Sequence, residues 1–105
     1  MCKRKDGFMV KYKRILIKLS GESLAGYKKT GVCYDAVLEI CKKIKEVYDL
    51  GVEVAIVVGG VNFWRGRQNE EFDRVTADYI GILATTMNAL TLNDSFRQIG
   101  VESRV

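Results

Sequence analysis

Histidine and proline are both absent from the sequence, and only three of its 105 residues are cysteine. The lack of histidine excludes every catalytic scheme built on a Ser-His or Cys-His pair. Because Cys2, Cys33 and Cys41 form no Cys-x-x-Cys pair, we expect reduced thiols and no structural metal site. Any chemistry must therefore come from lysine, arginine, carboxylates and backbone amides.

Long hydrophobic runs are absent too. The first apolar stretch, Ile15 to Leu19, is interrupted by Lys18 and is far too short for a signal-peptide core or a membrane span. With 48% hydrophobic residues and no low-complexity segment, the chain has the composition of one small globular domain. We therefore expect a cytoplasmic protein that does not enter a membrane.

Positive charge is concentrated at the start of the chain. Lysine and arginine number 17 against 13 aspartates and glutamates, and the early cations are Lys3, Arg4, Lys5, Lys11 and Lys13. We expect residues 1–11 to form a basic, disordered tail and residues 12–105 to form the folded part. Without interleaved aromatic residues or a recognition motif, nucleic acid is not favoured as a partner of this tail.

Hydrophobic patterning predicts a strand, a helix and a second strand. Residues 13–19 and 52–58 are short, β-branched and apolar, as in strands of a parallel sheet. Residues 35–50 place apolar side chains at three- and four-residue steps between lysines and glutamates, which is typical of an amphipathic helix. Residues 20–31 are predicted to be a glycine-punctuated loop. The order of these elements predicts a right-handed βαβ unit.

A long helical pattern follows, from residue 74 to the glycine at position 100, with Asp73 as a candidate N-cap. Gly81 and the later "TLND" stretch favour a kink or a break in this helix. The final residues, 101–105, have the pattern of a third strand. We expect the chain to be the first part of a larger α/β domain.

Both glycine-containing turns lie at the carboxyl ends of predicted strands, where parallel α/β sheets bind ligands. Glycine lets backbone amides approach a phosphate, and Lys18 and Arg65 could supply positive charge to a phosphoryl group. Each feature also has an ordinary explanation: a tight turn, a lysine that reaches solvent, a surface arginine, and a solvated carboxylate at Asp78. The Walker and Rossmann glycine patterns are both absent, which excludes the two commonest phosphate loops.

Four segments together resemble the N-terminal portion of the bacterial uridylate kinase (UMP kinase) family of the amino acid kinase superfamily. They are "YKRILIKLSGESLAG", "KEVYDLGVEVAIVVGGVNFWRG", "DRVTADYIGILATTMNAL" and "GVESRV", and the resemblance runs from Tyr12 to Val105. It implies a three-layer αβα sandwich with a mainly parallel sheet, present here as an incomplete N-terminal part. It also implies transfer of the γ-phosphoryl group of ATP to UMP with Mg²⁺, giving UDP in pyrimidine nucleotide biosynthesis. Family members are cytoplasmic homohexamers that are commonly activated by GTP and inhibited by UTP.

The family's K-L-S-G segment matches Lys18, Leu19, Ser20 and Gly21, which by resemblance would bind the ATP phosphates. Lys18 would also stabilise the phosphoryl group during transfer, so it is a candidate catalytic residue. Magnesium would be bound together with ATP, and no residue of this chain is assigned to it as a metal ligand.

The family's G-G-G-N turn matches Gly59, Gly60, Val61 and Asn62. By resemblance, the two glycines would contact UMP, while Val61 and Asn62 would lie at the ATP phosphates. Val61 replaces the family's third glycine, and a β-branched residue resists positive φ and brings methyl groups toward the anion. This substitution predicts an effect on ATP affinity or turnover.

The resemblance also assigns two residues beyond this turn. Arg65 would contact nucleotide phosphates and take part in catalysis. Asp78, in "TADY", would hold UMP through its ribose hydroxyls.

Other functions stay open from the sequence. A different superfamily member, such as a carbamate, acetylglutamate or aspartate kinase, also begins with a lysine-containing strand and a glycine turn. A noncatalytic module could instead oligomerise through apolar positions of the long helix, including Ile82, Leu83, Met87 and Leu90. If the chain belongs to a UMP kinase, we expect these 105 residues alone not to complete an active site.

Overall fold

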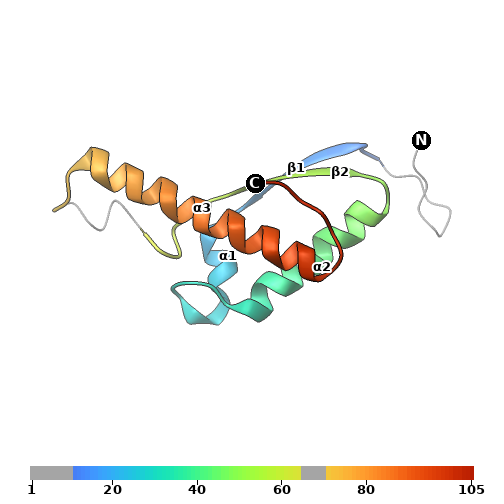
Figure 1. Ribbon diagram of the computed structural model, residues 1–105, viewed down its shortest axis with the longest axis horizontal. Helices are drawn as coiled ribbons and strands as arrows, with labels where there is room; N and C mark the ends of the chain where they lie inside the picture. Colours follow the sequence, from blue (N-terminus) through green and yellow to red (C-terminus); the bar gives the residue numbers. More distant parts are fainter. Residues whose placement is uncertain (1–10, 65–70) are drawn as a thin grey trace.

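The two predicted strands form a parallel pair in the computed structural model, which describes residues 11–64 and 71–105. Strand β1 (Arg14–Leu19) pairs with β2 (Glu53–Val58) from Arg14 opposite Glu53 to Leu19 opposite Val58. Helix α2 (Tyr34–Asp49) connects the strands, so the predicted βαβ unit is confirmed. Both strands therefore end at the same edge of the sheet (Figure 1).

Helix α2 begins and ends close to the residues that the sequence predicted. Asp35 lies in its first turn, where a carboxylate stabilises the positive end of the helix dipole. Its C-terminal end is followed by Gly51 with a φ of 90°, a conformation that glycine adopts without steric cost. The apolar residues Val37, Cys41 and Ile44 recur at three- and four-residue steps and are buried, so this face packs into the core.

Helix α3 (Arg74–Gln98) is continuous, so a break at Gly81 or in "TLND", one of the two predicted alternatives, is wrong. Its N-cap is the predicted Asp73, whose carboxylate accepts a hydrogen bond from Thr76 N at 3.1 Å. A single glycine costs a helix about 1 kcal/mol, which tertiary contacts can offset. Gly81 has such a contact, since a Cβ placed there would lie 3.9 Å from Trp64 Cδ1.

Residues 20–31 were predicted as a loop, but the chain forms helix α1 (Gly21–Ala25) and the 3₁₀ turn η1 (Gly26–Lys28) there. Ser20 caps α1, because its Oγ accepts a hydrogen bond from Ser23 N at 3.3 Å. Leu24 and Ala25 are almost fully buried, at 0% and 1% exposure. Burial of this short apolar pair stabilises a helix too brief to show a sequence period.

Residues 101–105 do not form the predicted third strand. Val101 is buried in the core, whereas the four residues after it are exposed. A strand needs a neighbour for its backbone hydrogen bonds, and the described sheet contains only β1 and β2. The apolar pattern of this segment thus reflects one buried valine.

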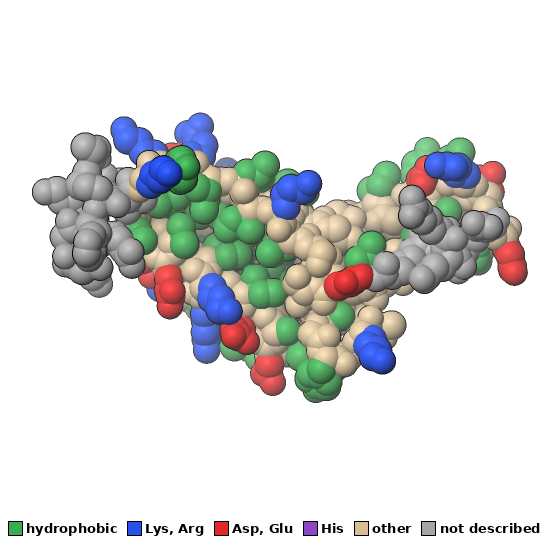
Figure 2. Space-filling model, turned by 180° about the vertical axis from the view of Figure 1, so that it is seen from behind, with side chains coloured by type: hydrophobic (Ala, Val, Ile, Leu, Met, Phe, Trp, Pro, Cys, Tyr) green, Lys and Arg blue, Asp and Glu red, His purple; other side chains and the backbone are tan. Residues whose placement is uncertain are grey.

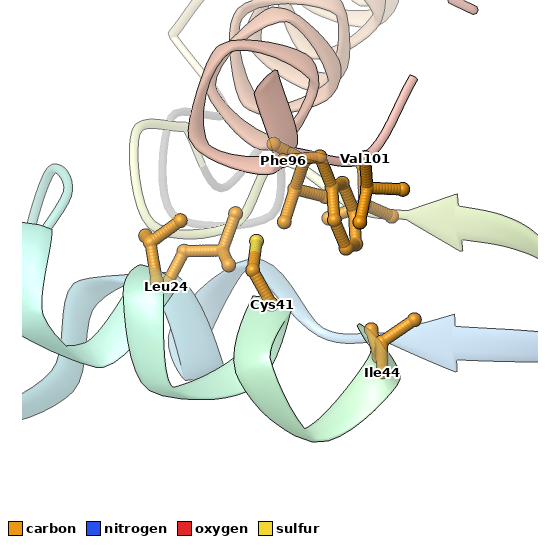
Figure 3. Close-up of a cluster of buried hydrophobic side chains, with 8 residues drawn as sticks. Leu24, Cys41, Ile44, Phe96 and Val101 are labelled. Atoms are coloured by element: carbon orange, nitrogen blue, oxygen red, sulfur yellow. The ribbon is translucent and has the colours of Figure 1, made fainter. Parts of the chain in front are cut away.

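The hydrophobic core lies between the sheet and the helices. Figure 3 shows Leu24 of α1, Cys41 and Ile44 of α2, and Phe96 of α3 pointing toward one another, with Val101 beside Phe96. The remaining buried members are Val37, Val58 and Leu92.

In the described part, helices cover one face of the sheet (Figure 1). Ile15, Ile17 and Leu19 of β1 are partly buried, whereas the alternate residues Leu16 and Lys18 are exposed. Alternation along a strand places these two sets on opposite faces. The chain thus builds two layers of the expected three-layer sandwich.

A groove of about 600 Å³ runs beside β2, and we call it the β2-edge groove. Its strand side is formed by β2 residues, and no β1 residue lines it, so it lies at the edge of β2 that β1 does not cover. The other lining residues include Ala89, Leu92, Asn93 and Phe96 of α3, and Val101–Val105. Most of the lining is apolar.

The N-terminal half of α3 projects from the rest of the molecule (Figure 1). Large apolar side chains on this half are exposed, and Figure 2 shows hydrophobic side chains at that end. Those of α3 more than half exposed are Val75, Tyr79, Ile82, Leu83 and Leu90. None of the described helices is long and apolar enough to cross a membrane.

Candidate functional site

The two glycine-containing turns meet at the carboxyl edge of the sheet. Gly59 N, just after β2, donates a hydrogen bond to Leu19 O at 3.2 Å. A Cβ at Gly21 would lie 2.5 Å from Asn62 Oδ1 and 2.9 Å from Val61 N. Only glycine allows so close an approach, so the predicted juxtaposition of the two turns is confirmed.

The first turn places Ser20 and Gly21 at the start of α1, directly after β1. Lys18 is opposite Val57 in the sheet register, and its side chain is exposed on the uncovered face of the sheet. The structure thus agrees with the alternative in which Lys18 reaches solvent. Lys18 is the second-last residue of β1, so its backbone lies near the edge where the turns meet.

The second turn is tight and packs directly on α3. Gly60 O accepts hydrogen bonds from Phe63 N at 3.0 Å and Trp64 N at 3.1 Å. A Cβ at Gly60 would lie 2.8 Å from Ala84 Cβ and 2.9 Å from Thr85 N, closer than real contacts allow. The glycine is therefore required by the close approach of a helix.

Val61 adopts an ordinary backbone conformation. Among the described residues, the only non-glycine residue with positive φ is Lys29, and Gly59 and Gly60 are also outside that region. The expected conflict between Val61 and a positive φ is therefore wrong. The side chain of Val61 is 38% exposed, so its methyl groups border solvent beside the turn.

Asn62 is buried at 3% exposure, and its side chain bonds within the protein. Its Nδ2 donates to Gly31 O at 2.8 Å and to Asn88 Oδ1 at 3.1 Å. Its Oδ1 accepts from Asn88 Nδ2 at 2.7 Å. With both amide hydrogens engaged, the side chain of Asn62 has no donor left for a phosphate oxygen, so any such donor would have to come from its backbone.

Asn88 is a residue of this region that the sequence did not single out. It is fully buried on α3, and its Nδ2 donates a second hydrogen bond to Gly59 O at 2.7 Å. The sequence signal that could have identified Asn88 is its spacing from two small residues of the same helix. Gly81, Ala84 and Asn88 are three and four residues apart, which places them on the one face of α3 that contacts the second turn.

Asp78 lies on α3 three residues before Gly81, so it continues this face toward the projecting end of the helix. Its side chain is exposed. Asp78 thus lies beyond the turn and outside the packed cluster. Arg65, the other predicted catalytic residue, lies outside the described residues.

Charged and nucleophilic groups elsewhere do not form a second reactive centre in the described chain. Burial raises the pKa of the Cys41 thiol to about 11, so it stays protonated and unreactive near neutral pH. Arg14 pairs with Glu53 at the opposite end of the strands, and both are well exposed. Within residues 11–64 and 71–105, no three acidic or thiol side chains gather into a set that could hold a metal ion.

Comparison with known proteins finds the model of the amino acid kinase family matching residues 13–105. A solved structure of UMP kinase from Bacillus anthracis is 44% identical with a TM-score of 0.77, covering 83% of this chain and 36% of that one. UMP kinase from Ureaplasma parvum is 31% identical with a TM-score of 0.78, covering 87% of this chain and 41% of that one.

The chain therefore spans less than half the length of these two structures. Their likeness supports the expected fold class, with this chain as an incomplete part of the domain. Since the family model covers nearly all of the sequence beyond the basic start, the chain belongs to the amino acid kinase family.

Proposed function

We propose that this chain is the N-terminal part of a UMP kinase, which transfers the γ-phosphoryl group of ATP to UMP. The observation that carries the proposal is the contact between the Ser20-Gly21 turn and the Val61-Asn62 turn at the carboxyl edge of the sheet. Backbone amides of such turns can bind phosphate oxygens without interference from a Cβ. The 44% identity to a UMP kinase favours this member of the family over the amino acid and carbamate kinases.

We assign each residue a role from its place at the carboxyl edge of the sheet. Leu19, Ser20 and Gly21 would hold ATP phosphates from one side, and the backbone of Val61 and Asn62 from the other. Lys18, at the end of β1, would bring its ammonium to the phosphoryl group, where positive charge lowers the barrier.

UMP would lie beside Gly59 and Gly60, toward the projecting end of α3 that carries Asp78. Gly59 and Gly60 form the backbone there, and the exposed carboxylate of Asp78 can accept hydrogen bonds from ribose hydroxyls. Magnesium would arrive with ATP, coordinated by its phosphates. A cytoplasmic hexamer with GTP activation and UTP inhibition belongs to the same proposal.

The sharpest test is a chimaera in which residues 12–105 replace the matching segment of the Bacillus anthracis enzyme. We expect it to form ADP in the presence of UMP, and not with aspartate, acetylglutamate or carbamate. Lys18→Ala should lower turnover by about 100- to 1,000-fold, as loss of a transition-state charge does. Arg14→Ala, on the same strand and exposed side, is the matched control and should retain turnover.

The 105-residue chain alone should show no UMP-dependent ADP formation, because it covers only 36% to 41% of the two UMP kinase structures. Rapid turnover by the chain alone would contradict this part of the proposal. An inactive chimaera that is folded would contradict the assignment to UMP kinase.

A second candidate is a noncatalytic module that oligomerises through α3, and the exposed Ile82 and Leu83 favour it. We expect the chain to form concentration-dependent oligomers in sedimentation velocity, which Leu83→Lys should dissociate. Tyr27→Lys, at a side chain that is 83% exposed on η1, is the control. Oligomers without nucleotide binding by the chimaera would support this second function over the first.

A further inference from the structure

The buried amides of Asn62 and Asn88, which we call the asparagine pair, bond to each other reciprocally. Asn88 Nδ2 donates to Asn62 Oδ1 at 2.7 Å, and Asn62 Nδ2 donates to Asn88 Oδ1 at 3.1 Å. Each amide has one further hydrogen, and each uses it on a backbone carbonyl: Gly59 O for Asn88 and Gly31 O for Asn62. All four amide hydrogens of the pair are thus satisfied.

Two apolar side chains of similar size would fill this space without the desolvation cost of two amides. They could not, however, bond the carbonyls of Gly59 and Gly31. A buried polar pair that is fully satisfied fixes a single arrangement of its partners. The pair therefore contributes geometry more than net stability.

The partners belong to three segments that are distant in sequence. Gly59 begins the turn after β2, Asn88 lies on α3, and Gly31 lies between η1 and α2. Gly31 is held twice, since its N also donates to Asn62 O at 2.9 Å. The position of the turn is consequently set by the side chain of Asn88, and that of the loop at Gly31 by the side chain and carbonyl of Asn62, which Asn88 holds in turn.

We infer that Asn88 is a positioning residue, which acts through Asn62 to hold the phosphate-binding turn in place and to couple it to the loop at Gly31. That this coupling affects catalysis rests on the proposed function. The coupling itself concerns only the residues of this chain. Asn88 does not touch substrate in this scheme.

The test compares Asn88→Leu with Asn93→Leu in the full 105-residue chain. Asn93 is a matched control, because it lies on the same helix and accepts a hydrogen bond from Ser103 at 2.6 Å, away from the turn. Amide hydrogen exchange measures how well the turn is held in place, and it needs no bound nucleotide. In Asn88→Leu we expect exchange at Gly31 and residues 59–64 to quicken by about tenfold to a hundredfold, the effect of losing a buried hydrogen bond.

Exchange in the centres of β1 and β2 should quicken much less than in the turn. In Asn93→Leu the turn should exchange as in the unaltered chain. If Asn88→Leu quickens all segments equally, the residue is merely structural and the inference is overturned. Should that variant not fold, Asn88→Ser, which shortens the side chain but keeps it polar, replaces it with the same two outcomes.

A double variant, Asn62→Leu with Asn88→Leu, separates packing from positioning. Removing both amides leaves no unpaired side-chain amide, so the urea midpoint should fall by less than the sum of the two single changes. Exchange at Gly31 should stay fast, because Gly31 O has lost its side-chain donor and only the bond from Gly31 N to Asn62 O still holds this loop to the turn. Slow exchange at Gly31 in this variant would show that the pair only fills space.

The effect on catalysis is measured in the chimaera, at a temperature below that at which any variant unfolds. Asn88→Leu should lower kcat/KM by about tenfold or more while Asn93→Leu leaves it unchanged. If the exchange results hold and the unaltered chimaera has no activity, the proposed function fails and the coupling stands. If the chimaera is active and insensitive to Asn88→Leu, the positioning role fails.

Discussion

The two borders of strand β2 differ in how closely they are packed: its carboxyl end is close-packed, and its outer edge is open. At the carboxyl end, backbone meets backbone: Gly60 lies against α3, and Gly21 lies against the amide of Asn62. Along the outer edge, the same strand borders the β2-edge groove of about 600 Å³. At Gly60 and Gly21 there is no room for one added carbon atom, whereas the groove has room for several. A strand can thus be closely constrained where it ends and open along its length.

The largest expected effect comes from adding one methyl group at the close-packed end. Gly60→Ala would place a Cβ within 2.9 Å of the α3 backbone, which cannot move aside as a side chain can. We expect a loss of about 3 kcal/mol or more in the free energy of unfolding, measured by urea titration.

Gly59→Ala is the control for this change. The nearest atom to its Cβ would be 3.9 Å away, and its φ is not positive, so the loss should stay below about 1 kcal/mol. Equal losses at both glycines would show that the close approach to α3 is not the cause.

The next comparison replaces two alanines of α3 by leucine, one at the close-packed end and one at the β2-edge groove. Ala84→Leu, buried against Gly60, should destabilise by about 1 to 3 kcal/mol through overpacking. Ala89→Leu extends into the β2-edge groove and should be neutral or slightly stabilising. Thermal unfolding of the two variants checks this order, and the reverse order would contradict the description of the groove as open space.

The core beneath both regions contains a titratable group. The thiol pKa of Cys41 is raised from 9.0 to about 11, so between these values the folded state keeps a proton that the unfolded state loses. Stability should therefore fall as pH rises through this window, by up to about 2 to 3 kcal/mol. The measurement is the pH dependence of the urea midpoint in the unaltered chain minus that in Cys41→Ala. A difference that does not change from pH 8 to 11 would contradict the burial of this thiol.

The smallest effect is expected where the strands begin. The ion pair of Arg14 and Glu53 is exposed, with side-chain exposures of 79% and 67%. Solvent and salt screen such pairs, so Glu53→Gln should change the free energy of unfolding by less than about 1 kcal/mol. A double-mutant cycle with Arg14→Met at two salt concentrations measures the pair directly. A coupling that persists in high salt would show that the pair is better shielded than its exposure indicates.

The elements with a clear hydrophobic period were predictable from the sequence. β1, β2, α2 and the ends of α3 follow from local patterns and caps, because those signals lie within each element. α1 was missed because five residues are too few to show a period. The third strand at 101–105 was wrongly predicted, since a strand depends on a partner that local sequence does not contain.

For the site, the sequence predicted which turns lie together but not the contacts between their side chains. The rule that parallel strands end at one edge placed Gly21 and Gly59 together correctly. The partners of the Asn62 side chain were not predictable, because the pairing with Asn88 joins residues 26 positions apart through tertiary packing. The conformation of Val61 was likewise set by the turn, whose glycines serve close packing and not a positive φ.

The contacts of Gly81, Ala84 and Asn88 fix the rotation of α3 about its own axis. Helix geometry then sets the direction in which the exposed side chain of Asp78 projects. Deleting one residue between Asp78 and Gly81 would turn that carboxylate by about 100° and move it by about 1.5 Å along the axis. The number of residues between Asp78 and Asn88 is therefore constrained as strictly as the identity of the residues that pack on the turn.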